Sequence, residues 1–312
     1  MSDVNHSIVI DNVSLVRGKK KVISDLSVSF QAGQTVAIIG CSGSGKTSLL
    51  ACVATALPIN AGDICIEGTS IQKDIRSARR SIGYVPAILH RCPHVRSDEF
   101  LELFAFEAGL SGKPMRTAVK KSLEMAGITD PGTPVDSLPN GKAQRLMIAR
   151  SLLHEPNILI FDDPFHSLDP IEQQKTEELI TDLSLSGRTI IAAINNGIVP
   201  SCFSHLGLLE KGSLTTLRPA VFAAFQKNLN RTWSYRVVCP STAGKAMAAL
   251  RNFGIHVIHV DDDTLDCLFD PAVVPCDELL SLLVKAGITV ASATVHPSWT
   301  VQLLNNTSEA EC

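Results

Sequence analysis

The stretch ILIFDDPFHSLDP (158–170) is an apolar run that ends in two adjacent carboxylates, Asp162 and Asp163. Two acids at the end of a buried strand repel one another and lose solvation, so the pair is costly unless a cation or a reaction uses it. The pair therefore predicts a site that holds a metal ion, performs acid–base chemistry, or does both.

A second stretch, GCSGSGKT (40–47), follows an apolar strand and opens a helix, which is the context that a phosphate-binding loop requires. Its glycines let backbone N–H groups point at phosphate oxygens, Lys46 reaches the terminal phosphates, and the Thr47 hydroxyl binds Mg²⁺. The alternative, a plain turn and helix cap, does not explain why strand, motif and helix occur together. The predicted nucleotide-binding residues of this loop are Gly40, Cys41, Ser42, Gly43, Ser44, Gly45, Lys46, Thr47 and Ser48.

Asp162 supplies the second part of a magnesium site. In P-loop proteins a strand that ends in Asp helps to hold the metal, and the strand NILIFD ends at Asp162. The alternative is an Asp that only caps the turn after a strand. Thr47 and Asp162 are thus the predicted metal ligands, which leaves Asp163 for the reaction itself.

The pattern of elements around these residues is typical of an α/β protein. Residues 8–39 read as successive strands, and a helix from Lys46 to about Thr55 should follow the glycine-rich loop. Residues 97–127 carry helical spacing. Between about 157 and 210 strands alternate with helices, which predicts a mostly parallel sheet covered by helices.

The C-terminal part follows a different pattern. Residues 218–231 resemble a connecting helix and linker, and residues 232–296 read as strand, helix, strand, strand, helix and strand. That order predicts a ferredoxin-like α+β unit, although the fold by itself names no function. We therefore expect a first domain at 1–217, a linker at 218–231 and an accessory domain at 232–312.

Composition narrows the function classes. The chain has 312 residues, 45% of them apolar and 19% charged, with a net charge of −3, so a nucleic-acid partner is not expected. No apolar run approaches the roughly 20 residues that span a bilayer, and a soluble protein is expected. The 9 cysteines contain no C-x-x-C pair, which favours reduced thiols over disulfides or a zinc site.

The stretch SLPNGKAQRLMIARSLLHEPNILIFDDPFHSLDP (137–170) resembles the nucleotide-binding subunits of ABC transporters. The family's L-S-G-G-Q signature, basic helix, acidic strand and dimer loop follow one another in the same order. RRSIGYVPAILH (79–90) resembles the family's glutamine loop, and GRTIIAAINNG (187–197) resembles its last core strand and switch histidine. The likeness covers residues 8–217, and the tail resembles the C-terminal domain of ABC-2 type exporters.

This resemblance implies an α/β P-loop ATPase core with an antiparallel β subdomain, a helical arm at about 88–155 and the C-terminal ferredoxin-like domain. It implies ATP and Mg²⁺ as ligands, with ATP held between the P-loop of one subunit and the signature of another. It also implies a homo- or heterodimer at the inner face of the membrane, bound to a separate permease subunit through the arm and the 88–96 loop. The implied dimer-loop residues are Ser167, Leu168 and Asp169.

Several positions depart from the family's pattern. Asp163 stands where the family has its catalytic Glu, Ala87 stands at the glutamine position, and Asn195 stands at the switch-histidine position. Arg17 replaces the aromatic residue that stacks on adenine; a guanidinium can also stack on a base. The signature is represented by Leu138, Pro139, Asn140, Gly141 and Lys142.

These departures bear on turnover. Asp163 is one methylene shorter than Glu, whereas a general base must come within about 3 Å of the water it activates. Ala87 cannot ligate a metal, and Asn195 cannot become positively charged. We therefore expect ATP binding with weak or no hydrolysis, in a transporter subunit that is an exporter. The alternatives are a slow but real ATPase driving export, and a non-hydrolysing, ATP-gated assembly or regulatory module outside transport.

Overall fold

The computed structural model divides the chain into two compact units, Met1–Pro219 and Ala220–Cys312, each of which is described by itself. No helix in the described part of the chain is long and apolar enough to cross a membrane. The structure describes residues 6–18, 20–40, 43–87, 92–195, 199–217, 233–239, 242–252, 256–260, 264–269 and 276–297. The expected linker, 218–231, lies outside them, as do Cys41, Ser42 and part of the 88–96 loop.

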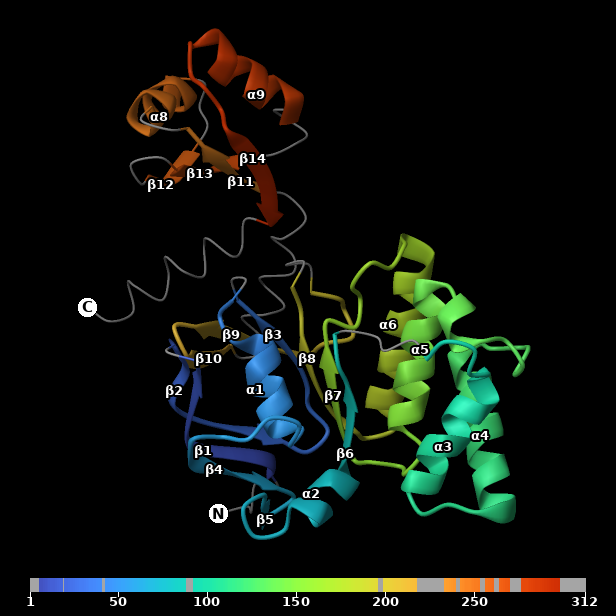
Figure 1. Cartoon of the computed structure of the whole chain (residues 1–312). Helices are drawn as coiled ribbons and strands as arrows, with labels where there is room; N and C mark the ends of the chain where they lie inside the picture. The colour runs from blue at the N-terminus through green and yellow to red at the C-terminus, as the bar shows by residue number, and fades with distance from the viewer. Residues whose placement is uncertain are drawn as a thin grey trace. The chain divides into compact units, whose positions relative to one another are not determined.

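A six-stranded sheet forms the centre of the first unit (Figure 1). Its order is β10-β9-β3-β8-β7-β6, and every neighbouring pair is parallel except β9 and β10. The strands are β3 (Thr35–Ile39), β6 (Ile82–Val85), β7 (Ile158–Asp162), β8 (Thr189–Ala193), β9 (His205–Glu210) and β10 (Ser213–Leu217). Because every residue of β3, β7 and β8 is buried, these strands read as continuous apolar runs, as the mostly parallel sheet predicted from the sequence requires.

An antiparallel sheet packs beside this core. Its order is β2-β1-β4-β5, and the strands are β1 (His6–Arg17), β2 (Lys20–Gln31), β4 (Ala61–Ile66) and β5 (Thr69–Ser70). Helix α1 (Lys46–Val53) lies between the two sheets, and Leu49, Leu50 and Val53 join the apolar cluster that fills this space. Helix α2 (Ile75–Ser81) then leads into β6. The expected antiparallel subdomain is therefore present.

Helices make up the remainder of the first unit. They are α3 (Ser97–Glu107), α4 (Gly112–Ala126), the short 3₁₀ helix Val135–Ser137, α5 (Asn140–Ser151) and α6 (Pro170–Leu185). Arg145 of α5 pairs with Glu172 of α6 at 2.5 Å in a largely buried contact, and Arg150 donates to the Tyr84 carbonyl at 2.8 Å. The signature helix α5 is thereby tied both to α6 and to the strand that precedes Ala87.

The second unit contains the six predicted elements in the predicted order. They are β11 (Trp233–Val238), α8 (Ala243–Asn252), β12 (His256–Val260), β13 (Thr264–Phe269), α9 (Cys276–Lys285) and β14 (Ser292–Pro297). The sheet order is β12-β13-β11-β14, and each pair is antiparallel. This arrangement is the ferredoxin-like fold expected from the sequence.

The second unit should fold without the first, because Leu250 and Leu283 are fully buried within it and compact units of this kind carry their own core. We expect the fragment 232–296 to melt cooperatively by circular dichroism, and the fragment 1–217 to keep Mg·ATP binding. A 232–296 fragment without a cooperative melt would show that the domain boundary is misplaced.

Candidate functional site

The glycine-rich loop connects β3 to α1 in a conformation that depends on glycine. Gly40, Gly43 and Gly45 have φ values of 155°, 79° and 107°, a region in which residues with a side chain are strained. A Cβ on Gly40 would also collide with the carbonyl oxygen of Leu209. These described glycines therefore suit a tight turn, and the Gly40 backbone lies close to β9.

Lys46 and Thr47 begin α1, and the Thr47 side chain reaches the end of β7. The Lys46 side chain is buried, at 5% exposure, and its Nζ donates to the Gly40 carbonyl at 2.7 Å. The Thr47 hydroxyl donates to Asp162 Oδ1 at 3.2 Å. The two predicted metal ligands, far apart in sequence, are thus in direct contact, and Ser48 lies beside them with its side chain largely buried.

Asp162 is a buried carboxylate with an unsatisfied oxygen. The residue is 1% exposed, and its Oδ2 has no hydrogen-bond partner. Burial raises the pKa of Asp162, and the charge of Asp163 raises it further, against the lowering effects of Thr47, Lys46 and the Ala87 backbone. Oxygen ligands of this kind suit Mg²⁺. Thr47 and Asp162 therefore fit the metal, which when bound would neutralise phosphate charge.

The raised pKa of Asp162 predicts a gain in stability when its charge is removed. Burying the ionised Asp162 lowers the free energy of unfolding of the ligand-free protein. This loss is absent below the unfolded-state pKa of about 3.9, where Asp162 is protonated in both states, and it is complete above the raised folded-state pKa. Asp162→Asn should therefore raise the melting temperature near pH 7 but not at acid pH, while losing stabilisation by Mg·ATP. Exposed Asp182→Asn is the control. A lower neutral melting temperature for ligand-free Asp162→Asn would contradict this.

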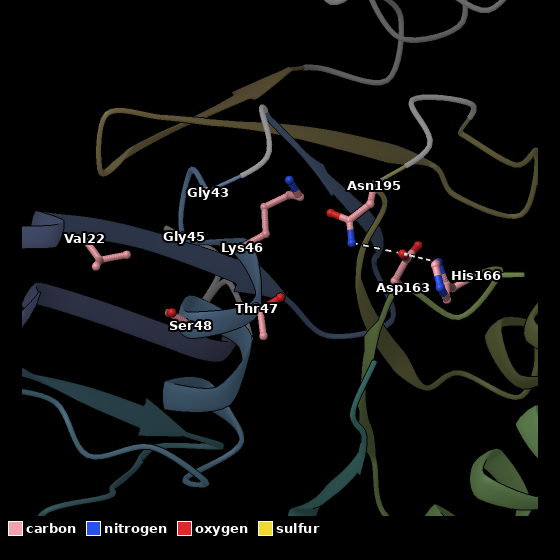
Figure 2. A pocket seen from close by; sticks show the side chains of 9 residues that line it. All are labelled: Val22, Gly43, Gly45, Lys46, Thr47, Ser48, Asp163, His166 and Asn195. Carbon is pink, nitrogen blue, oxygen red and sulfur yellow. Dashed lines mark hydrogen bonds and ion pairs between the residues drawn. The ribbon is translucent and has the colours of Figure 1, made fainter. Parts of the chain in front are cut away.

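Asp163 follows β7 in a left-handed conformation, with φ 53°. Its backbone N–H donates to the Ala193 carbonyl at 3.0 Å, which holds the residue against the end of β8. The Asn195 amide Nδ2 donates to Asp163 Oδ2 at 2.9 Å, and His166 Nδ1 lies 3.5 Å from the same oxygen. Figure 2 shows Asp163 between these two side chains.

These groups surround one cavity of about 500 Å³. Its lining consists of Gly43, Gly45, Lys46, Thr47, Ser48, Asp163, Asn195, Val22 and His166. The last two were not predicted. Val22 lies on a distant strand and gave no local signal, whereas His166 stands three residues after the second aspartate, a spacing that brings side chains together in a tight turn.

Several predicted residues, Asp162 among them, are not part of this lining. Ala87 contributes no side chain to the cavity, although its backbone hydrogen-bonds to Asp162. Arg17 ends β1 with an exposed side chain and is not among the lining residues. Ser44 is inside the loop, and its buried hydroxyl has no hydrogen-bond partner.

The predicted signature segment (138–142) and the predicted dimer loop (167–169) contact one another within this chain. Leu138 is buried, Pro139 is the N-cap of α5 without a side-chain cap, and Lys142 is partly exposed. The Asn140 amide donates to the Ser167 carbonyl at 3.4 Å. A Cβ on Gly141 would collide with the Glu172 side chain.

The dimer loop ends in a helix cap. Asp169 accepts a hydrogen bond from the Glu172 N–H at 2.8 Å and begins α6. Leu168 donates its N–H to the Phe165 carbonyl at 3.4 Å, which closes the turn before it. The two predicted segments therefore lie next to one another at the start of α5 and α6.

A protein-family model described as ABC transporter matches residues 23–166. The glutamine transport ATP-binding protein GlnQ of Bacillus subtilis (strain 168) is 30% identical over 227 residues, which cover 71% of this chain and 93% of GlnQ. The linearmycin resistance ATP-binding protein LnrL of the same organism is 26% identical over 209 residues, covering 66% of this chain and 67% of LnrL. Some of the relatives are named as export proteins and others as import proteins.

Solved structures agree on the fold. A dimeric ATP-binding cassette, in a post-hydrolysis state bound to ADP and Pi, superposes with a TM-score of 0.61 at 23% identity. The superposition covers 68% of this chain and 98% of that chain. With the phosphate loop, the Thr47–Asp162 contact and a relative matched along nearly all of its length, the chain belongs to the ABC transporter family and carries the family's ATP-binding domain.

Proposed function

We propose that this protein is the ATP-binding subunit of an exporter and couples ATP binding, with weak or no hydrolysis, to a separate membrane subunit. ATP binding is supported by the contact between Thr47 and Asp162 beside the glycine-rich loop. Asp162 Oδ2, which has no hydrogen-bond partner, can bind a cation. Lys46 on the same helix supplies positive charge for the terminal phosphates.

Low turnover is supported by the surroundings of Asp163. Its side chain is only 8% exposed, and Oδ2 is already hydrogen-bonded by Asn195. A carboxylate that is covered and engaged in this way is a poor partner for an attacking water. Ala87 offers no side-chain group to orient that water. We therefore expect ATP to bind at this site and to be hydrolysed slowly.

The working unit in this proposal is a dimer in which the P-loop of one subunit faces the signature of the other. Asp163, Ala87 and Asn195 then belong to the site built on this chain's own P-loop, whereas Pro139 to Lys142 belong to the opposite site. In a homodimer, both sites contain all of these altered residues. In a heterodimer with an unaltered partner, one site contains the altered catalytic residues and the other contains the altered signature. Neither arrangement contains a fully equipped site.

The helical arm is the proposed docking surface for a permease subunit. Leu103 and Phe106 on α3 are large apolar side chains that are mostly exposed. Exposed apolar side chains of this kind favour a protein partner. Docking would place the protein at the inner face of the membrane, and export is favoured by the likeness of the C-terminal domain to those of ABC-2 exporters.

The second candidate is a non-hydrolysing, ATP-gated module outside transport, which the Asn195–Asp163 hydrogen bond favours because it occupies the second carboxylate. Mg·ATP binding and phosphate release, measured on the same purified sample, test both. Binding with slow release supports the proposed function. Binding with no release favours the second candidate, and no binding contradicts both.

A further inference from the structure

We propose that His166, rather than Asp163, accepts the proton of the attacking water during the residual ATP hydrolysis of this site. This inference rests on the proposed function. The observation behind it is a contrast in access: the Asp163 side chain is 8% exposed and the His166 side chain 68% exposed, although both line the P-loop cavity. Water in the cavity therefore reaches the imidazole more readily than the carboxylate.

The turn after β7 brings these two side chains together. The backbone of Asp163 is in the left-handed conformation, and the His166 N–H donates to the Asp163 carbonyl at 3.1 Å. Together these features form a tight turn. His166 Nδ1 consequently lies 3.5 Å from Asp163 Oδ2 (Figure 2). The arrangement places the imidazole at the cavity wall, in the same cavity as Lys46 and Thr47.

Asn195, Asp163 and His166 form a chain of polar contacts. Asn195 holds Asp163 Oδ2 from one side, and His166 Nδ1 approaches the same oxygen from the other. A carboxylate beside Nδ1 favours the tautomer with its proton on Nδ1, which leaves Nε2 as an acceptor. The charged groups that share the cavity wall with this imidazole are Asp163 and Lys46. Asp163 thus acts as the positioning residue.

The proposed step is a simple hydrolysis. A water O–H bond breaks as its proton moves to His166 Nε2, and the water oxygen forms a bond to the γ-phosphorus. The bond between that phosphorus and the bridging oxygen breaks, and its electron pair leaves with ADP. The imidazolium then returns the proton to solvent. Asp163, whose Oδ2 is held by Asn195, stabilises the imidazolium that forms.

The test uses the full-length protein with Mg·ATP. His166→Gln should lower phosphate release by about 10²-fold and leave Mg·ATP affinity unchanged. Wild-type release should rise with pH, because only a neutral imidazole can accept a proton, whereas release by His166→Gln should not change with pH. The matched control is His6→Gln, which removes a histidine on β1 outside the cavity and should keep both the rate and its pH dependence.

Two further measurements separate a proton acceptor from a structural histidine. Added imidazole should restore phosphate release in His166→Ala, because a small base can enter the vacated space. Nitrogen NMR of the ligand-free protein should show neutral His166 protonated on Nδ1, and Asp163→Asn should shift the ring toward the other tautomer. The second measurement needs no turnover.

The inference is overturned if His166→Gln releases phosphate at the wild-type rate, if wild-type release does not depend on pH, or if the wild type binds ATP and releases no phosphate. Absence of rescue by imidazole in a folded, ATP-binding His166→Ala protein also overturns it. In each of these outcomes ATP binding persists, so the binding half of the proposed function stands. Loss of ATP binding by the wild type would instead overturn the proposed function.

Discussion

Lys46→Ala should abolish measurable Mg·ATP binding. The buried ammonium group lies at the start of α1 and donates to the Gly40 carbonyl, from which position it can transfer its donors to the terminal phosphates. Each charge-assisted hydrogen bond contributes about 1.5–3 kcal/mol, so losing two weakens binding by roughly 10²- to 10⁴-fold. Isothermal titration calorimetry on the full-length protein measures this change directly.

The control for this substitution is Lys113→Ala, which removes an exposed lysine of α4 and should leave the affinity unchanged. Circular dichroism must show that Lys46→Ala keeps the wild-type melting behaviour, so that loss of binding is not loss of fold. Equal affinity of wild type and Lys46→Ala for Mg·ATP would refute the phosphate-binding role of the loop.

Rebuilding the family's catalytic positions should accelerate phosphate release by about 10²-fold or more, because a positioned base alone is worth about 10²- to 10⁴-fold. The variant combines Asp163→Glu, Ala87→Gln and Asn195→His with a repaired signature. The gain will not be the sum of the parts, since these groups act on one water and one phosphate. Phosphate release at saturating Mg·ATP is the measurement.

Asp163→Glu alone should recover little. Asp163 is left-handed, a conformation that Asp tolerates better than most residues, and its carboxylate is bound by Asn195. A longer acid would meet the same amide, while water orientation and the charged switch would still be missing. Asn195→His removes the amide as well as adding a titratable ring, so the two substitutions should be strongly coupled.

Repair of the signature has a structural consequence of its own. Pro139 is the N-cap of α5 and supplies no side-chain cap. Pro139→Ser adds a hydroxyl that can accept from the first turn, which stabilises a helix by about 1 kcal/mol. The repaired-signature variant should therefore melt higher than wild type, independently of its effect on the opposite site.

The unmodified protein sets the reference for the rebuilt variant. With any natural partner present, its turnover should lie well below the typical enzyme rate of about 10 per second. If the pure, unmodified protein releases several phosphates per second, the site contains a working base in its present surroundings. In that case the departures from the family's pattern do not limit catalysis, and the weak-hydrolysis half of the proposal fails.

Much of the fold follows from local pattern. Three patterns depend only on residues that are close together in the sequence. They are the apolar run that ends at Asp162, the glycines of residues 40–45, and the alternation of strands and helices over 157–210. Conformational restrictions on glycine, and the burial of both faces of a parallel strand, act at that range. The six elements of the C-terminal unit were likewise readable from periodicity alone, in the order that the structure has them.

The contacts that define the site act between distant positions, and only the tertiary structure decided them. Val22 joins the cavity because the antiparallel sheet packs over α1, and Asn140 meets Ser167 because α5 and α6 begin side by side. His166 carried no recognisable motif. It reaches the cavity because the left-handed turn at Asp163 folds the loop back, and Asn195 meets that aspartate because β7 and β8 are neighbours. The periodicity of apolar residues indicates which face of a helix or strand is buried. It does not indicate which helices and strands will lie next to one another in the fold.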